Sequence, residues 1–188
     1  MSALWLIRHG PTHAKGMCGW SDLPADLSDT AAIARLAASL PVAPVISSDL
    51  DRAARTADAV AGDRPRLPHA PQLREIHFGD WELKRHDEIE AESPELVRAF
   101  WDRPGDVAPP AGESWNALRA RCDAAIDRVW TGGDLIVVAH FGVILTQLQR
   151  ALGCDARQVF AHRIEPLSLT RIEIGAQGWQ AAEINRLP

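Results

Sequence analysis

Cysteine is scarce in this sequence, and its spacing excludes two common kinds of site. The 188 residues include three cysteines, Cys18, Cys122 and Cys154, which are odd in number and lie far apart. They form neither a disulfide framework nor a CxxC zinc motif. The histidines outside the motifs described below show no HxH or HExxH spacing either. We therefore expect a protein without a metal ion or any other cofactor.

Long apolar runs and an excess of positive charge are also absent. No run approaches the length of a membrane-spanning helix, and no secretory leader precedes the first predicted strand. The formal net charge of -5 is not that of a general nucleic-acid-binding protein. We expect a cytoplasmic protein with no membrane or nucleic-acid partner. An anionic ligand would need a locally cationic pocket on this acidic chain.

The hydrophobic residues that are present predict an α/β fold. Hydrophobic residues make up 46% of the chain and charged residues 24%, which is typical of a packed globular protein. Apolar runs that predict strands alternate with segments of helical periodicity, which favours a three-layer α/β/α sandwich around a mostly parallel central sheet. The length suits a single domain over residues 1–188. The strands are expected near 4–7, 45–46, 66–69, 135–139, 167–174 and 179–184, and the helices near 28–40, 50–61, 87–101, 114–130 and 143–152.

Residues 71–112 are too long and irregular for an ordinary connection. They contain a structured loop around Glu75, the helix expected over 87–101, and a segment rich in proline and glycine over 102–112. We interpret residues 76–112, approximately, as a small lid insertion near the edge of the sheet. Ser114, which follows this segment, is expected to cap the next helix.

Two predicted strands end in similar polar sequences. The first strand stops at Arg8-His9-Gly10, and the strand over 135–139 stops at His140-Phe141-Gly142. Parallel strands place their carboxyl ends at one edge of the sheet, where ligands bind in open α/β folds. We expect Arg52, just after the strand near 45–46, to reach back over the same edge. Glu75 supplies a carboxylate in the loop that follows.

In these motifs and their order the chain resembles the histidine phosphatase (phosphoglycerate mutase-like) superfamily. The resemblance covers residues 4–142 and implies an α/β fold, a phosphohistidine intermediate and no metal. The motifs are Arg8-His9-Gly10-x-Thr12, Ser48-x-Leu50-x-Arg52-Ala53-x-x-Thr56-Ala57, Leu73-x-Glu75-x-x-Phe78-Gly79-x-Trp81-Glu82, Ala111-Gly112-Glu113-Ser114 and Val137-Val138-Ala139-His140.

These residue types suit phosphoryl transfer, which needs positioned cations around the charged oxygens. Arg8 and Arg52 can each bind phosphoryl oxygens in a bidentate manner, and a protonated His140 would add a third donor. His9, neutral at its attacking nitrogen, is expected to be the nucleophile. Glu75 is expected to protonate the leaving alkoxide and then to activate water, which favours a mildly acidic pH optimum.

Five further residues are candidates for contact with the substrate. The family often has Asn where this chain has Lys15, and it usually has Gly where this chain has Phe141. Either difference can change which substrate the enzyme prefers. Thr12 is either a phosphate contact or a simple turn hydroxyl. The complete set of substrate-binding candidates is Gly10, Thr12, Lys15, Gly19 and Phe141.

The short chain resembles the phosphatase branch of the superfamily, and its loop over residues 19–24 is similar to that of the α-ribazole phosphatases. We therefore predict a hydrolase acting on a small-molecule phosphomonoester, as a monomer or homodimer. Two alternatives stay open, a phosphoglycerate mutase and a non-catalytic module that binds a phosphorylated ligand.

Overall fold

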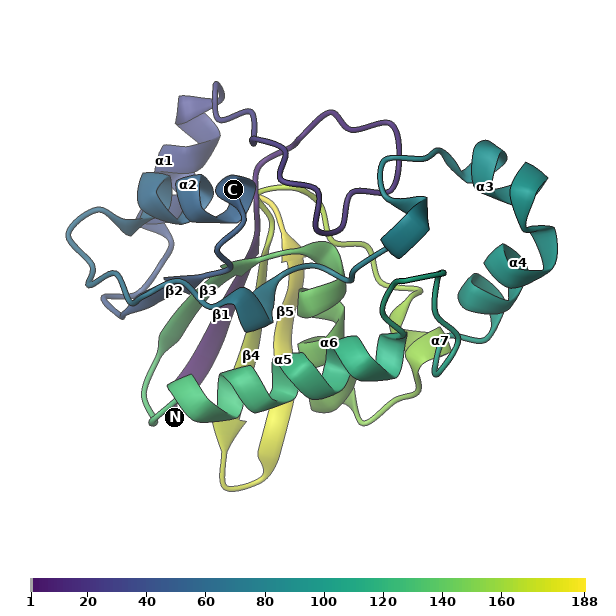
Figure 1. Ribbon diagram of the computed structural model, residues 1–188. Helices are drawn as coiled ribbons and strands as arrows, with labels where there is room; N and C mark the ends of the chain where they lie inside the picture. Colours follow the sequence, from purple (N-terminus) through teal and green to yellow (C-terminus); the bar gives the residue numbers. More distant parts are fainter. Residues whose placement is uncertain (1) are drawn as a thin grey trace.

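The computed structural model describes residues 2–188 and contains one five-stranded sheet with the strand order β2-β3-β1-β4-β5 (Figure 1). The strands are β1 (Ser2–Arg8), β2 (Val45–Ser47), β3 (Leu135–Ala139), β4 (Leu169–Gly175) and β5 (Gly178–Arg186). The first strand of the chain therefore lies at the centre of the sheet, between two strands from the second half.

Only half of the sheet is parallel. β3 pairs in parallel with β1 and with β2, whereas β4 pairs antiparallel with β1 and with β5. The expectation of a mostly parallel sheet is therefore inexact. The tight turn over residues 175–178 can join only antiparallel strands, because a parallel connection needs a long crossover.

Helices cover both faces of the sheet, which confirms the three-layer α/β/α arrangement. Successive residues of β3 point to opposite faces: Val137 packs in the core beneath α5 (Trp115–Val129) and α6 (Phe141–Leu152), and Val138 packs beneath α1 (Thr30–Ala38) and α2 (Asp51–Ala61). All five residues of β3 are buried, as the continuous apolar run predicted.

Polar side chains cap the starts of two helices, and one of them is the predicted cap Ser114. The Asp29 carboxylate accepts the backbone N–H of Ala32 at the start of α1, and the Ser114 hydroxyl accepts that of Ala117 at the start of α5.

The lid region differs from expectation in one respect. The helix predicted over 87–101 is two helices, α3 (His86–Glu92) and α4 (Pro94–Asp102). Ser93 between them lies outside the helical region, with φ of -147° and ψ of 61°, because the residue before a proline is driven away from helical geometry. Within this segment Phe100 of α4 and Trp81 of the short 3₁₀ turn η2 (Gly79–Trp81) lie edge to face, with ring centroids 5.5 Å apart.

Three short helical elements were not predicted: η2, η1 (Pro71–Leu73) and α7 (Ala156–Val159). The strand expected near 66–69 is instead a single bridge between Arg66 and Val45, because Pro65 and Pro68 flank it and lack the N–H groups of a ladder. Over residues 2–188 no helix has the length and apolar character needed to cross a membrane.

A single arginine joins the ends of α1 and α2. The Arg64 guanidinium donates hydrogen bonds to five backbone carbonyls, at 2.6–3.3 Å. Carbonyls at a helix end have no partner within the helix, so Arg64 supplies donors to both helices at once. The acceptors are Ala37, Leu40, Pro41, Val60 and Ala61.

We expect Arg64→Met to lower the free energy of unfolding by about 2 kcal/mol, because it leaves several half-buried carbonyls unpaired. Urea denaturation measures this change. The control is Arg55→Met on α2, whose exposed ion pair with Asp51 contributes less than about 1 kcal/mol. Equal effects of the two substitutions would show that Arg64 does not join the helices.

Candidate active site

The pairing of β1 with β3 brings the two predicted strand-end histidines together. Arg8 is in register with Ala139, and the next backbone N–H, that of His9, donates to the Ala139 carbonyl at 3.0 Å. The rings of His9 and His140 consequently lie edge to face, with centroids 5.0 Å apart, and both are buried.

His9 is held with one nitrogen ready to act as a nucleophile. Its Nδ1 lies 2.6 Å from the Gly10 carbonyl, which can only accept, so the proton resides on Nδ1 and the lone pair on Nε2. The Arg52 Nε–H donates to that Nε2 at 3.3 Å. Burial and the positive charge of Arg52 lower the pKa of His9 to about 3. The imidazole is therefore neutral and nucleophilic at physiological pH.

Arg52 reaches the site from the first turn of α2 and is only 1% exposed. Its terminal nitrogens donate to the carbonyls of Ser21 at 2.8 Å and Gly19 at 2.5 Å. Since carbonyls are neutral, they satisfy the guanidinium without cancelling its charge. Gly19, predicted as a substrate contact, here orients Arg52; its contact with substrate stays a prediction.

The Glu82 carboxylate organises this loop from the opposite side. It accepts the backbone N–H groups of Gly19, Trp20 and Ser21 at 2.7–3.1 Å, as well as the Ser21 hydroxyl at 2.6 Å. The loop thus lies between the Arg52 guanidinium and the Glu82 carboxylate. Sequence analysis quoted Glu82 within a motif but gave it no role, because these contacts join segments about sixty residues apart.

Arg8 is the second cation of the site. One terminal nitrogen donates to the Ile164 carbonyl at 2.6 Å, and the guanidinium lies 5.6 Å from the centre of the Phe141 ring. Its buried Nε has no hydrogen-bond partner in the described chain. Phe141, where the family usually has glycine, therefore touches a phosphate-binding candidate rather than standing apart from the site.

Glu75 is a buried carboxyl group held by backbone amides. Both of its oxygens lie 3.1 Å from the Gly142 N–H, and Oε1 also accepts the N–H of Ile76 at 2.9 Å. A methyl group at position 142 would lie 2.4 Å from Oε1, so only glycine permits this approach. Burial raises the pKa of Glu75, which favours the protonated form that a general acid requires.

His140 is fully buried, and within residues 2–188 neither of its ring nitrogens has a hydrogen-bond partner. Burial and the neighbouring His9 and Arg52 place its pKa well below the usual range. The structure thus favours a neutral His140 before phosphate binds, in contrast to the protonated donor considered above. A neutral imidazole still offers one N–H to an anion.

The remaining candidates are spread over the rim and the scaffold. The Gly10 N–H donates to the Thr56 hydroxyl at 3.0 Å, which in turn donates to the Arg52 carbonyl at 2.7 Å. Thr56, to which sequence analysis gave no role, thus ties the nucleophile's loop to α2. Thr12 accepts the Ala14 N–H at 3.4 Å in a local turn, and Lys15 is exposed; their contacts with substrate stay predictions.

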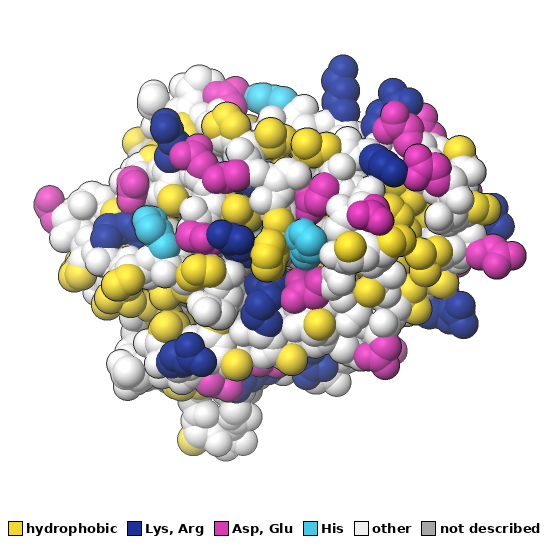
Figure 2. Space-filling view, in the orientation of Figure 1, with side chains coloured by type: hydrophobic (Ala, Val, Ile, Leu, Met, Phe, Trp, Pro, Cys, Tyr) yellow, Lys and Arg dark blue, Asp and Glu magenta, His cyan; other side chains and the backbone are white. Residues whose placement is uncertain are grey.

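The outer surface carries charges of both signs, whereas the site holds two arginines, Arg8 and Arg52, and the single carboxyl group of Glu75. On the face shown in Figure 2, lysine and arginine side chains alternate with acidic ones. Within residues 2–188 no three His, Cys, Asp or Glu side chains are grouped to hold a metal ion. The groups available for chemistry at this site are therefore two arginines, two histidines and one carboxyl group.

A model of the histidine phosphatase superfamily (branch 1) matches residues 4–187. The chain belongs to this superfamily. The adenosylcobalamin/alpha-ribazole phosphatase of Salmonella typhimurium is 30% identical over 181 residues, which are 91% of this chain and 90% of the relative. These matches confirm the predicted family and the predicted phosphatase class of enzyme.

Solved structures agree. The alpha-ribazole phosphatase from Shigella flexneri superimposes with a TM-score of 0.85 at 26% identity, covering 99% of this chain and 98% of the other. A mycobacterial glucosyl-3-phosphoglycerate phosphatase gives 0.84 at 25% identity, with all of both chains covered. Phosphatases named for different substrates thus share this fold, so the substrate has to be argued from the site.

The opposite pKa shifts of His9 and Glu75 predict an asymmetric pH profile. With an alkyl phosphate, we expect kcat to stay level down to about pH 4, because His9 gains a proton only near its lowered pKa of about 3. We expect kcat to fall as the pH rises through the raised pKa of Glu75, since the carboxylate has no proton to give. Steady-state kinetics at saturating substrate measure both limbs. Glu75→Gln should abolish the alkaline limb; an acid limb between pH 5 and 7 would contradict a neutral, buried His9.

Proposed function

We propose that the protein hydrolyses small phosphomonoesters through a phosphohistidine formed on His9. One observation carries this proposal: a neutral His9, with its Nδ1 proton donated to a carbonyl, holds its Nε2 against Arg52, whose terminal nitrogens donate to neutral carbonyls rather than to a carboxylate. A histidine in an ordinary loop would have neither the fixed tautomer nor the cation at its free nitrogen.

The reaction proceeds in two displacements. In the first, the Nε2 lone pair forms a bond to phosphorus, the phosphorus–oxygen bond to the alcohol breaks, and Glu75 gives its proton to the departing oxygen. In the second, the Glu75 carboxylate takes a proton from water, whose oxygen attacks phosphorus and breaks the phosphorus–nitrogen bond. Arg8, Arg52 and His140 stabilise the charged oxygens throughout. No step requires a metal ion.

Hydrolysis of p-nitrophenyl phosphate in the presence of EDTA tests this proposal. We expect the activity to withstand EDTA and to fall by at least about 1000-fold in His9→Ala, because the covalent route is lost. Quenched wild-type enzyme should carry an acid-labile, alkali-stable phosphoryl group that the variant lacks. His86→Ala, at an exposed histidine of the lid, is the control. Equal activity of His9→Ala and wild type would refute the phosphohistidine route, and an inactive wild type would favour a binding module.

The space beside Glu75 indicates the class of leaving group. An open hollow adjoins the Glu75 carboxyl group. Its walls are aromatic, and none of its lining residues is a lysine or arginine. Figure 2 shows hydrophobic side chains reaching the surface beside the lid. The aromatic lining residues are Phe78, Phe100, Trp101, Trp115, Phe141 and Phe160.

Such a hollow favours an alcohol that carries a flat apolar ring over one that carries a carboxylate. A carboxylate would enter an apolar space without a cationic partner, which is costly. We therefore propose an ester of the α-ribazole phosphate kind, after the relatives named above, in preference to a phosphoglycerate. The same reasoning disfavours the mutase alternative. We propose that the enzyme acts in the cytoplasm, as a monomer or homodimer, with no nucleic-acid or membrane partner.

A panel of substrates tests the leaving-group class. We expect kcat/KM to be at least about 10-fold higher for 1-naphthyl phosphate or α-ribazole 5′-phosphate than for 3-phosphoglycerate, and Trp101→Ala to reduce that preference. Trp179→Ala, on β5, is the matched control. A preference for 3-phosphoglycerate would contradict the proposal. Interconversion of phosphoglycerates after priming with bisphosphoglycerate would establish the mutase alternative.

A further inference from the structure

An ion pair that takes no part in the reaction lies behind Glu75. Arg121 extends from α5, and two of its nitrogens donate to the two oxygens of Glu113, at 2.9 and 2.7 Å. Both side chains are more than four-fifths buried. This bidentate geometry fixes the plane of the guanidinium and directs its remaining donors away from Glu113.

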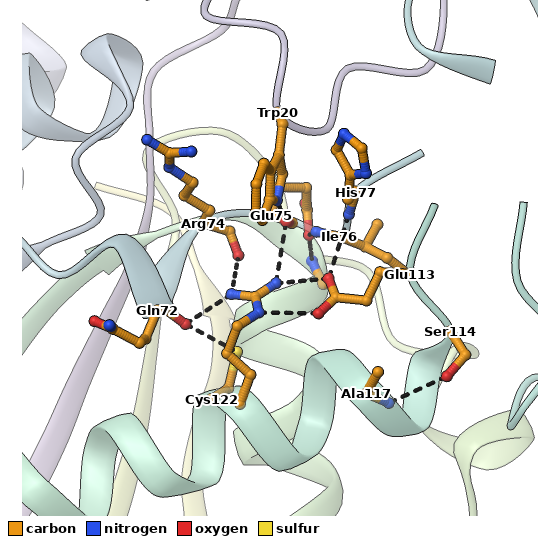
Figure 3. Close-up of polar contacts among 12 residues, drawn as sticks. Trp20, Gln72, Arg74, Glu75, Ile76, His77, Glu113, Ser114, Ala117 and Cys122 are labelled. Carbon is orange, nitrogen blue, oxygen red and sulfur yellow. Dashed lines mark hydrogen bonds and ion pairs between the residues drawn. The ribbon is translucent and has the colours of Figure 1, made fainter. Parts of the chain in front are cut away.

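Those donors bind the backbone that leads into Glu75 (Figure 3). One terminal nitrogen of Arg121 donates to the carbonyls of Gln72 at 2.7 Å and Arg74 at 3.0 Å, and the other donates to the Glu75 carbonyl at 3.3 Å. The Trp20 indole N–H also donates to the Glu75 carbonyl, at 2.8 Å. The backbone carbonyls of Gln72, Arg74 and Glu75 therefore accept hydrogen bonds from side chains rather than from the N–H groups of a helix or strand.

Glu113 holds the chain on the other side of Glu75. Its Oε2 accepts the His77 N–H at 3.3 Å, and its own backbone N–H donates to the His77 carbonyl at 2.8 Å. The Arg121 guanidinium thus binds backbone carbonyls of residues 72–75, and Glu113 binds the backbone of residue 77. Hydrogen bonds from this pair therefore hold the backbone on both sides of the Glu75 side chain.

A general acid on a loop needs such support. Residues 74–78 belong to no helix or strand, so no regular ladder fixes the direction of the Glu75 side chain. A displacement of about 1 Å in a catalytic group can lower a rate by about 100-fold. We propose that Arg121 and Glu113 are positioning residues that aim the Glu75 carboxyl group at the oxygen of the leaving group. This inference rests on the proposed role of Glu75.

A merely structural brace and a positioning pair predict different kinetics. If the pair only stabilises the fold, its loss lowers the amount of folded enzyme and reduces the activity on every substrate equally. Loss of a positioning pair impairs proton donation, and the loss is greatest for leaving groups that cannot depart without a proton. p-Nitrophenolate departs unprotonated, whereas the alkoxide of benzyl alcohol does not. Both esters carry one aromatic ring, so the comparison isolates the proton.

The experiment compares p-nitrophenyl phosphate with benzyl phosphate in Arg121→Met. We expect kcat/KM, which reports the first displacement and excludes the second displacement common to both esters, to fall by about 10- to 100-fold for benzyl phosphate and by less than about 5-fold for p-nitrophenyl phosphate. Arg121→Lys, which keeps the charge but not the fork, should give an intermediate loss with the same selectivity. Where Arg121→Met does not fold, Glu113→Gln replaces it, since the amide oxygen can still accept from His77 while the ion pair is lost.

Two reference variants make the outcome decisive. Arg119→Met, on the same helix with a more exposed ion pair to Asp123, should leave both rates unchanged. Glu75→Gln should show the same selective loss in a larger measure; if it does not, the proposed role of Glu75 fails, whatever the effect of the Arg121 and Glu113 substitutions. If Glu75→Gln is selective but folded Arg121→Met loses both activities equally, or neither, the positioning role is overturned.

Discussion

The site depends on keeping an arginine charged inside a space from which water is largely excluded. Arg52 is almost completely buried, yet it is paired with carbonyl groups and an imidazole nitrogen rather than with a carboxylate. A carboxylate partner would satisfy the guanidinium and also neutralise it, leaving little attraction for a phosphate. Peptide dipoles stabilise the charge without removing it. The balancing anion is Glu82, which accepts the backbone N–H groups of the same loop whose carbonyls bind Arg52. Peptide groups therefore separate the two opposite charges.

The same positive field sets the state of the neighbouring groups. It disfavours protonation of His9 and His140, which burial disfavours already. For Glu75 the two influences oppose each other: burial favours the neutral acid, while Arg52, Arg8 and two backbone amides favour the carboxylate. Burial is the largest of these, but the amides remain in place after the proton has left. The site can therefore accommodate Glu75 in both of the states that a two-step hydrolysis requires.

What sequence analysis could reach was local. Arg8 ends a strand, and His9, His140 and Phe141 follow strands, whose apolar runs are easily recognised. Adjacent parallel strands must end on one edge. The break between α3 and α4 at Ser93 could have been predicted, since Pro94 follows it. The antiparallel pairing of β1 with β4 was not, because no local pattern encodes the direction of a distant partner. Roles for Thr56, Glu82, Glu113 and Arg121 were out of reach for a similar reason: each acts on a segment that is separate from its own helix or turn.

β1 leaves the ribosome first, but the strands that pair with it leave much later. Leu4 aligns with Leu135 on one side and with Ile172 on the other, so both neighbours of this central strand lie far downstream. Until they emerge from the ribosome, an apolar strand with two unpaired edges stays open to other chains. His9 reaches His140 only through that pairing. Recovery of activity during refolding would therefore report on the closure of the centre of the sheet, and a truncated chain that ends before β3 cannot assemble the site.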